Sequence, residues 1–158
     1  MEQKNNTVCF TGHRKISSEQ LNQLAWRLKD TVIKLINDGY TYFIAGGALG
    51  FDTLAAKTVL NLKSDYPDIR LILVLPCLSQ ADKWSSEDKR VYEVIKEAAD
   101  KVVYISDEYT KDCMYKRNRH LVDNSNACVC YLTEKTGGTA YTVKYAKKCN
   151  LLVINTAE

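Results

Sequence analysis

The sequence has no uninterrupted apolar run of about 18 residues, so a membrane-spanning helix is not expected. Its N-terminus also lacks the charged start and apolar stretch of a signal peptide. No two of its six cysteines form a C-x-x-C pair. Most of them lie in or beside apolar runs, which favours small buried side chains in a reducing cytoplasm over disulfides or zinc ligation. We therefore expect a cytoplasmic protein that needs neither a metal nor a cofactor.

A strong net charge is missing as well. The 158 residues carry a formal net charge of +3 at pH 7, with 26% charged and 46% hydrophobic residues. This composition is typical of a globular protein, and the length suits one domain over residues 1–158. The charge is too small for a dedicated nucleic-acid binder, so nucleic acid is not the expected partner. It does fit a local basic patch that faces a small anionic molecule.

Internal repeats, low-complexity tracts and linkers are also absent, and short apolar runs alternate with longer amphipathic ones. The capping-box pattern Ser17-x-x-Gln20 predicts the start of a first helix, which Asp38-Gly39 would end. Further helices are predicted over 51–63, 87–99, 111–124 and 139–149, and strands over 8–11, 41–45, 69–75, 101–105, 127–132 and 151–155. Strands that alternate with helices indicate an α/β fold, with a mostly parallel six-stranded sheet covered by helices on both faces.

The loops that follow the strands are where such a sheet binds ligands, because the carboxyl ends of parallel strands meet at one edge. Two of these loops, "GGALGFD" and "TEKTGGTAYT", carry a glycine pair and lead into a predicted helix. Glycine lets the backbone approach a phosphate, and a helix N-terminus attracts anions. A tight turn that needs glycine for itself is the alternative, but two such loops at one edge favour binding. The predicted phosphate-binding residues are Gly46, Gly47, Gly50, Gly137, Gly138 and Thr139.

This glycine arrangement differs from two common nucleotide-binding motifs. The dinucleotide fingerprint G-x-G-x-x-G follows the first strand and has an acid about 20 residues later. Here G-G-x-x-G follows the second predicted strand, and no acid is placed in that way. A P-loop is also absent, because the sequence has no G-K-[ST].

Several charged and polar residues flank the same predicted edge. The first loop holds Gly12, His13 and Arg14, which either touch a ligand or form an ordinary surface loop. Asp52 follows the first glycine pair, where it either accepts from a ribose hydroxyl or caps the helix start.

A basic run, "KRNR", lies on the predicted helix over 111–124. Its members Arg117, Asn118 and Arg119 are candidates for gripping phosphate. A solvated basic face, with an ion pair from Arg119 to Asp123 at i,i+4 spacing, is the alternative.

Two aromatic residues stand in polar loops, where a ring could stack on a base. Trp84 follows the third predicted strand and Tyr109 follows the fourth. Each has the equally plain alternative of packing against a neighbouring helix.

Five segments in order along the chain carry a resemblance to a known family. They are "FTGHR", "AGGALGFDTLAA", "LPCLSQADKW", "YKRNRHLVDNS" and "TGGTAYTVKYAKK". Together the segments resemble YpsA-type proteins of the SLOG superfamily. The resemblance implies a single Rossmann-like three-layer domain that binds a nucleotide or an ADP-ribose-like ligand. It also implies a link to bacterial cell division or stress signalling, and it makes a homodimer and a protein partner plausible.

One departure from the wider superfamily bears on catalysis. LOG-type phosphoribohydrolases resemble P-G-G-x-G-T-x-x-E, in which the glutamate helps to cleave an N-glycosidic bond. Depending on the alignment, Thr142 or Lys144 stands where that glutamate belongs, and neither is a carboxylate. The resemblance therefore favours a sensor or sequestering protein over an enzyme. An N-glycosidase with a displaced carboxylate is the alternative, with Asp52, Asp107, Glu108 and Asp123 as candidates. A single-stranded DNA binder, like the DNA-processing protein A relatives, is a further alternative.

Overall fold

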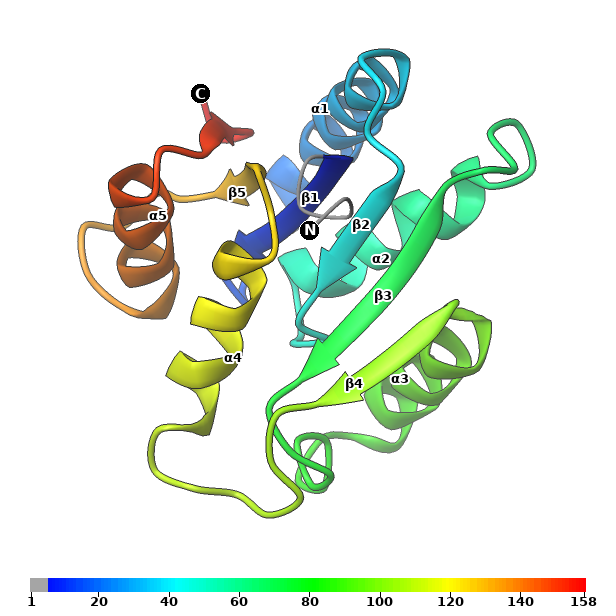
Figure 1. The fold of residues 1–158 in the computed structure, drawn as a ribbon. Coiled ribbons are helices and arrows are strands. Elements are labelled where there is room, and N and C mark those ends of the chain that lie inside the picture. Colours follow the sequence, from blue (N-terminus) through cyan, green and yellow to red (C-terminus); the bar gives the residue numbers. More distant parts are fainter. Residues whose placement is uncertain (1–5) are drawn as a thin grey trace.

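A computed structural model describes residues 6–158, in which strands and helices alternate as the sequence predicts (Figure 1). The strands are β1 Thr7–Gly12, β2 Tyr42–Ala45, β3 Arg70–Leu75, β4 Lys101–Tyr104, β5 Ala127–Tyr131 and β6 Leu152–Asn155. The helices are α1 Ser18–Asn37, α2 Phe51–Leu62, α3 Ser86–Ala98, α4 Cys113–Asp123 and α5 Gly138–Lys148. Each predicted segment is confirmed, with ends that differ by a few residues at most.

The six strands form one sheet in the order β4-β3-β2-β1-β5-β6. Every neighbouring pair within residues 6–158 is parallel, so the sheet is parallel throughout rather than mostly parallel. From β1 the chain adds strands on one side up to β4 and then crosses to the other side of β1 for β5 and β6. The strand order therefore reverses between β1 and β5, and the crevice at such a reversal is the usual ligand site of an open α/β sheet.

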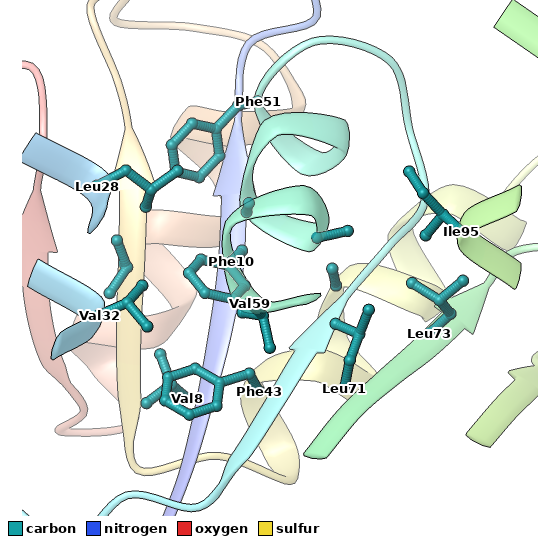
Figure 2. Close-up of a cluster of buried hydrophobic side chains, with 14 of the residues drawn as sticks. Val8, Phe10, Leu28, Val32, Phe43, Phe51, Val59, Leu71, Leu73 and Ile95 are labelled. Carbon is teal, nitrogen blue, oxygen red and sulfur yellow. The ribbon is translucent and has the colours of Figure 1, made fainter. Parts of the chain in front are cut away.

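Helices α1, α2 and α3 cover one face of the sheet, and α4 and α5 cover part of the other (Figure 1). The larger core lies under α1–α3, where aromatic and branched side chains interlock (Figure 2). Phe10 lies between Phe43 and Phe51, with ring centroids 6.1 Å and 6.3 Å away. These rings fix α2 against β1 and β2, so the start of α2 has a defined place at the edge of the sheet.

The smaller core lies under α4 and α5 and is rich in cysteine. Cys9, Cys128 and Cys130 are fully buried there beside Leu121 and Val143. All six thiols of the chain are free, and five are buried. This confirms the prediction of small buried side chains for all except the exposed Cys149. A hydrogen bond with the Cys9 thiol, together with burial, raises the pKa of Cys128, which keeps its sulfur protonated.

Helix α1 begins where the sequence predicts, but the predicted capping-box hydrogen bonds of Ser17 and Gln20 are wrong. Ser17 occupies the N-cap position, but its side chain caps no backbone N–H group. The Gln20 side chain is engaged elsewhere, because its Oε1 accepts a 2.6 Å hydrogen bond from the Tyr131 hydroxyl on β5. A tertiary contact has therefore replaced the local one.

None of the helices in the described part of the chain is both long and apolar enough to cross a membrane.

Candidate ligand-binding cleft

A cleft of about 380 Å³ opens at the strand reversal between β1 and β5. Its walls come from four segments: residues 10–14 at the end of β1, the loop after β2 with the start of α2, the inner face of α4, and residues 134–139 before and within α5. The volume lies within the range of small-molecule sites. Four segments that are distant in sequence thus line one cavity, at the edge of the sheet where the fold predicts a binding site.

The start of α5 is the part of this cleft best suited to an anion. The helix begins at Gly138 without a side-chain cap and without an acidic residue in its first turn. Its first N–H groups therefore have no partner within the helix, and the positive end of the helix dipole lies beside them. A Cβ atom added at Gly137 or Gly138 would meet no heavy atom within 4 Å. The backbone of both residues, which line the cleft with Thr139, is thus open to a ligand.

The other three predicted glycines face protein atoms instead of open space. A Cβ at Gly46 would collide with the Arg117 guanidinium, and one at Gly47 with the Leu75 side chain. Gly50 has a φ of +76° and lies against the Arg14 backbone, so no other residue fits there without strain. None of the three lines the cleft. Their direct phosphate contact stays a prediction, and the structure gives each of them a packing role.

Arg117 is the buried cation of the site, with only 5% of its surface exposed. Its NH1 group donates to the Gly46 carbonyl, its Nε donates to Asn118 Oδ1 at 2.8 Å, and its NH2 group lies 3.8 Å from Met114 Sδ. No carboxylate of residues 6–158 lies within salt-bridge distance of it. The five donors of a guanidinium are therefore only partly used, and the charge lacks a close counterion.

Asp52 is the acid nearest to that charge. It lines the cleft, is 6% exposed, and its Oδ2 accepts a 3.3 Å hydrogen bond from the Ala48 N–H group. Burial raises its pKa to about 6, although Arg117 and Arg14 act in the opposite direction. Burial likewise lowers the pKa of the Arg117 guanidinium. The carboxyl group therefore holds the loop after β2 in place and changes protonation close to neutral pH.

The loop after β1 contributes three of the predicted residues to the cleft wall. Gly12 packs against Phe51, so a side chain there would displace the ring. His13 Nε2 accepts a 2.9 Å hydrogen bond from the Thr133 N–H group, which ties the loops after β1 and β5 together. Arg14 is exposed, and no side-chain hydrogen bond or ion pair holds it among the described residues. Its guanidinium is therefore available to a ligand.

Besides Gly46, Gly47 and Gly50, three more predicted residues do not line the cleft. Trp84 packs edge-on against Tyr92, with ring centroids 5.1 Å apart, and belongs to the larger core. Tyr109 is 65% exposed on the loop after β4. Arg119 lies over the Tyr145 ring, with its Cζ atom 4.6 Å from the centroid.

The ion pair from Arg119 to Asp123, which belonged to the alternative interpretation of the basic run, is not among the salt bridges of residues 6–158. Asp123 Oδ1 instead accepts a 2.6 Å hydrogen bond from the Tyr145 hydroxyl. Tyr145 thus separates the two charges, because it engages one with its ring and the other with its hydroxyl.

The sequence did not single out six of the lining residues, which are Phe10, Thr11, Ala48, Met114, Glu134 and Thr136. Met114 precedes Arg117 and Asn118 at i,i+3 and i,i+4 spacing, so the helical period alone places it on their face. Glu134 and Thr136 adjoin the glycine pair before α5 and follow β5, which could have marked them as edge residues.

A second hollow of about 380 Å³ lies on the face of the sheet beside α4, lined by strand residues together with His120, Asp123 and Asn124. It contains no glycine pair and no helix N-terminus, so it lacks the features that suit the first cleft to an anion. No group of His, Cys, Asp or Glu within residues 6–158 is arranged to hold a metal ion.

Comparison with known proteins identifies relatives over most of the chain. Residues 8–152 match the family model YpsA, described as the YspA SLOG family. The chain is 31% identical to the SPbeta prophage-derived protein YoqJ of Bacillus subtilis (strain 168) over 147 residues, which cover 82% of this chain and 86% of that protein. It is 32% identical to a UPF0398 protein of Bacillus cereus (strain ATCC 14579) over 120 residues, which cover 74% of this chain and 65% of that relative.

Solved structures share the fold at much lower identity. DNA processing protein A from Helicobacter pylori, described in terms of its single-stranded DNA binding mode, superposes with a TM-score of 0.67 and 16% identity. The match covers 93% of this chain and 63% of that one. The Streptococcus pneumoniae protein gives the same TM-score at 17% identity, over 93% of this chain and 48% of that one. At these identities the likeness concerns the Rossmann-like fold alone.

Proposed function

The chain belongs to the YpsA family of SLOG proteins, and from that premise we propose that it binds a phosphorylated nucleotide or ADP-ribose-like ligand in the cleft between β1 and β5. The first turn of α5 would bind a phosphate through the N–H groups of Gly138 and Thr139. Arg14 would add charge from the loop after β1. Asp52 and Asn118 would accept from or donate to ribose hydroxyls.

The observation that carries this proposal is the buried Arg117 guanidinium at the cleft wall. A buried charge without a close counterion is costly, because it has lost its hydration without gaining a salt bridge. Asp52 offsets that cost only in part, since its own pKa of about 6 leaves some of it protonated near neutral pH. A phosphate bound at α5 would bring negative charge to the same cavity, so ligand binding would relieve an electrostatic imbalance that the free protein carries.

Binding without turnover would make the protein a sensor or a sequestering protein, which fits the missing LOG-type glutamate. Thr142 is buried and donates its hydroxyl to the Gly138 carbonyl, whereas Lys144 is exposed. Neither position offers a carboxylate to the ligand. In the same proposal, a protein partner or a second copy of the chain would bind preferentially to the ligand-bound form.

The test is calorimetric titration at pH 7.5 with AMP, NAD, ADP-ribose and ribose 5-phosphate. We expect at least one of them to bind, and Arg14→Ala to weaken it roughly tenfold, which is about 1.4 kcal/mol. Lys15→Ala is the matched control, because Lys15 is another exposed cation in the same loop but does not line the cleft. Absence of binding, or equal losses in the two variants, would contradict the proposal.

An N-glycosidase is the second candidate, and the environment of Asp52 is what favours it. Of the carboxylates considered from the sequence, only Asp52 lines the cleft. A carboxyl group with a pKa of about 6 can donate and accept a proton near neutral pH, as a displaced catalytic acid would need to do. Chromatography of nucleoside monophosphates incubated with the protein tests this. Free base and ribose 5-phosphate that form with the wild type, but not with Asp52→Asn, would establish turnover.

Single-stranded DNA is the ligand described for the Helicobacter pylori neighbour, and we keep it as a third candidate with the fold as its support. Electrostatic binding to the backbone weakens steeply with added salt. Fluorescence anisotropy with a labelled oligonucleotide at increasing salt concentrations therefore separates this candidate from a nucleotide site.

A further inference from the structure

Helices α4 and α5 meet at an aromatic pair, Tyr115 and Tyr141, that does not line the cleft. We call the surface around this pair the α4–α5 seam. Tyr115 on α4 and Tyr141 on α5 pack edge to face, with ring centroids 5.0 Å apart and an interplanar angle of 79°. Both remain accessible, at 49% and 38% of their surface. Such rings are usually buried in a core or an interface, so an exposed pair near a cleft is a candidate contact for an aromatic ligand.

The pair adjoins the proposed phosphate site on both helices. Tyr115 directly follows the cleft residue Met114, and Tyr141 lies in the first turn of α5 with Gly138 and Thr139. Helical side chains lean toward the N-terminus of their helix, so the Tyr141 ring is directed back along the turn that offers its N–H groups. A phosphate at that turn and a base on the rings would be joined through a single sugar.

The charge of the seam matches the same kind of ligand. Apart from the buried Arg117, α4 and α5 together carry five lysines and arginines and a single acid, Asp123, whereas the whole chain has a net charge of only +3. Further along the seam Arg119 lies over the Tyr145 ring. A surface that combines exposed aromatic rings with cations is complementary to an anion that carries a planar base.

The interior of the cleft provides no comparable ring. The aromatic residues in its wall are Phe10, which is fully buried, and His13, whose Nε2 is engaged by Thr133. Trp84 and Tyr109, the aromatic candidates from the sequence, lie outside the cleft. A base attached to a phosphate at α5 therefore finds its exposed stacking partner at the rim.

We infer that Tyr115 and Tyr141 form a base-stacking subsite, so that the protein takes nucleotides with a terminal phosphate and tolerates different bases. The inference rests on the proposed phosphate site at α5. Stacking on an exposed ring needs only the π-face that every base has, so it discriminates weakly between bases. Selectivity then comes from the phosphate and the sugar.

The experiment compares AMP with ribose 5-phosphate, which has the same phosphate and sugar but no base. Both are titrated calorimetrically into the wild type, into Tyr115→Leu/Tyr141→Leu, and into the control Trp26→Leu. The leucines keep apolar bulk without a π-face, and Trp26 is an exposed aromatic residue on α1, which covers the opposite face of the sheet. Unfolding midpoints verify that the variants are folded.

We expect the wild type to bind AMP roughly 5- to 100-fold more tightly than ribose 5-phosphate, and this ratio to approach one in the double leucine variant. Ribose 5-phosphate affinity should stay the same in all three proteins. GMP, CMP and UMP should bind the wild type within about tenfold of AMP, because stacking alone discriminates weakly between bases.

Equal affinities for AMP and ribose 5-phosphate in the wild type would overturn the subsite and leave the phosphate site intact. A ratio that survives the double substitution would also overturn it, as would a preference for one base above a hundredfold. If neither compound binds the wild type, the phosphate site itself fails and the subsite fails with it. A 5′-phosphorylated trinucleotide presents the same chemistry as AMP. Tighter binding of the trinucleotide would assign the site to strand ends, and tighter binding of AMP to free nucleotides.

Discussion

Asp52→Asn should stabilise the protein at neutral pH and do so less in acid. Burial raises the pKa of Asp52 to about 6 from 3.8, so the folded state binds a proton that the unfolded chain has already released between those values. Stability contributed by the protonated carboxyl group is therefore present below about pH 4 and is lost as the pH rises through about 6. Asparagine has nearly the same shape, can still accept from the Ala48 N–H group, and does not ionise.

The magnitude follows from the size of the shift. About two pKa units correspond to about 3 kcal/mol, which is the cost of burying the ionised carboxylate. From the linkage between protonation and folding, we expect the free energy of unfolding of Asp52→Asn to exceed that of the wild type by about 1 kcal/mol at pH 4.5 and by about 3 kcal/mol at pH 7.5. For a chain of this length, the larger figure corresponds to a melting temperature higher by about 6–12 °C.

Urea unfolding followed by circular dichroism across that pH range measures the difference at each pH. Asp68→Asn, at an exposed position in the loop before β3, controls for the substitution itself. The reasoning is refuted if the advantage of Asp52→Asn stays constant from pH 4.5 to 7.5, or if this variant is the less stable protein at pH 7.5. The second result would mean that the ionised carboxylate, held by Ala48 and the nearby arginines, contributes more than its burial costs.

The remaining predictions concern the glycines and the thiols. Gly46→Ala should cost about 1–3 kcal/mol in urea unfolding, because its Cβ collides with the buried Arg117 guanidinium. Gly138→Ala should leave the free energy of unfolding unchanged or raise it by up to about 1 kcal/mol, since its Cβ enters open space at an ordinary φ. Equal losses of stability in the two variants would contradict the conclusion that Gly138 faces open space while Gly46 is packed against Arg117. A thiol reagent should modify Cys149 alone in the folded protein and all six cysteines in denaturant, as counted by mass spectrometry. Rapid labelling of a second thiol in the folded state would contradict this, because it would show that the cysteine-rich core opens.

The sequence predicted the secondary structure well because its alternation is a local property. The run over 127–132 is apolar at nearly every position, as a strand buried on both faces must be, and the helices repeat their apolar residues at the helical period. Strand order and the exact cleft depend on long-range contacts, which such a pattern does not contain. The Gln20 side chain illustrates the difference, because a hydroxyl from β5 displaced its predicted local role.

The segments that line the cleft could be predicted at the level of loops, and less well at the level of single residues. Arg117 and Arg119 belong to one basic run, yet a rotation of two helical positions buries the first in the cleft wall and leaves the second over Tyr145. Glycine pairs that look alike in sequence also differ, since Gly46 faces a guanidinium and Gly138 faces open space. Tertiary packing decides which atoms surround each residue. Residue type alone therefore could not distinguish Arg117 from Arg119, or Gly46 from Gly138.

The central place of β1 has a consequence for when the cleft forms during synthesis. Strand β1 pairs with β2 through a short stretch of chain, but it meets β5 only after more than a hundred further residues, as the hydrogen bond from the Thr7 N–H group to Asn126 Oδ1 across 119 positions illustrates. Strands β1 to β4 can therefore associate while the rest of the chain is still on the ribosome. The first turn of α5, where we propose that a phosphate binds, is the last part of the cleft wall to be synthesised. A ligand that requires the complete cleft would therefore bind and stabilise only chains that have been synthesised at least through this turn.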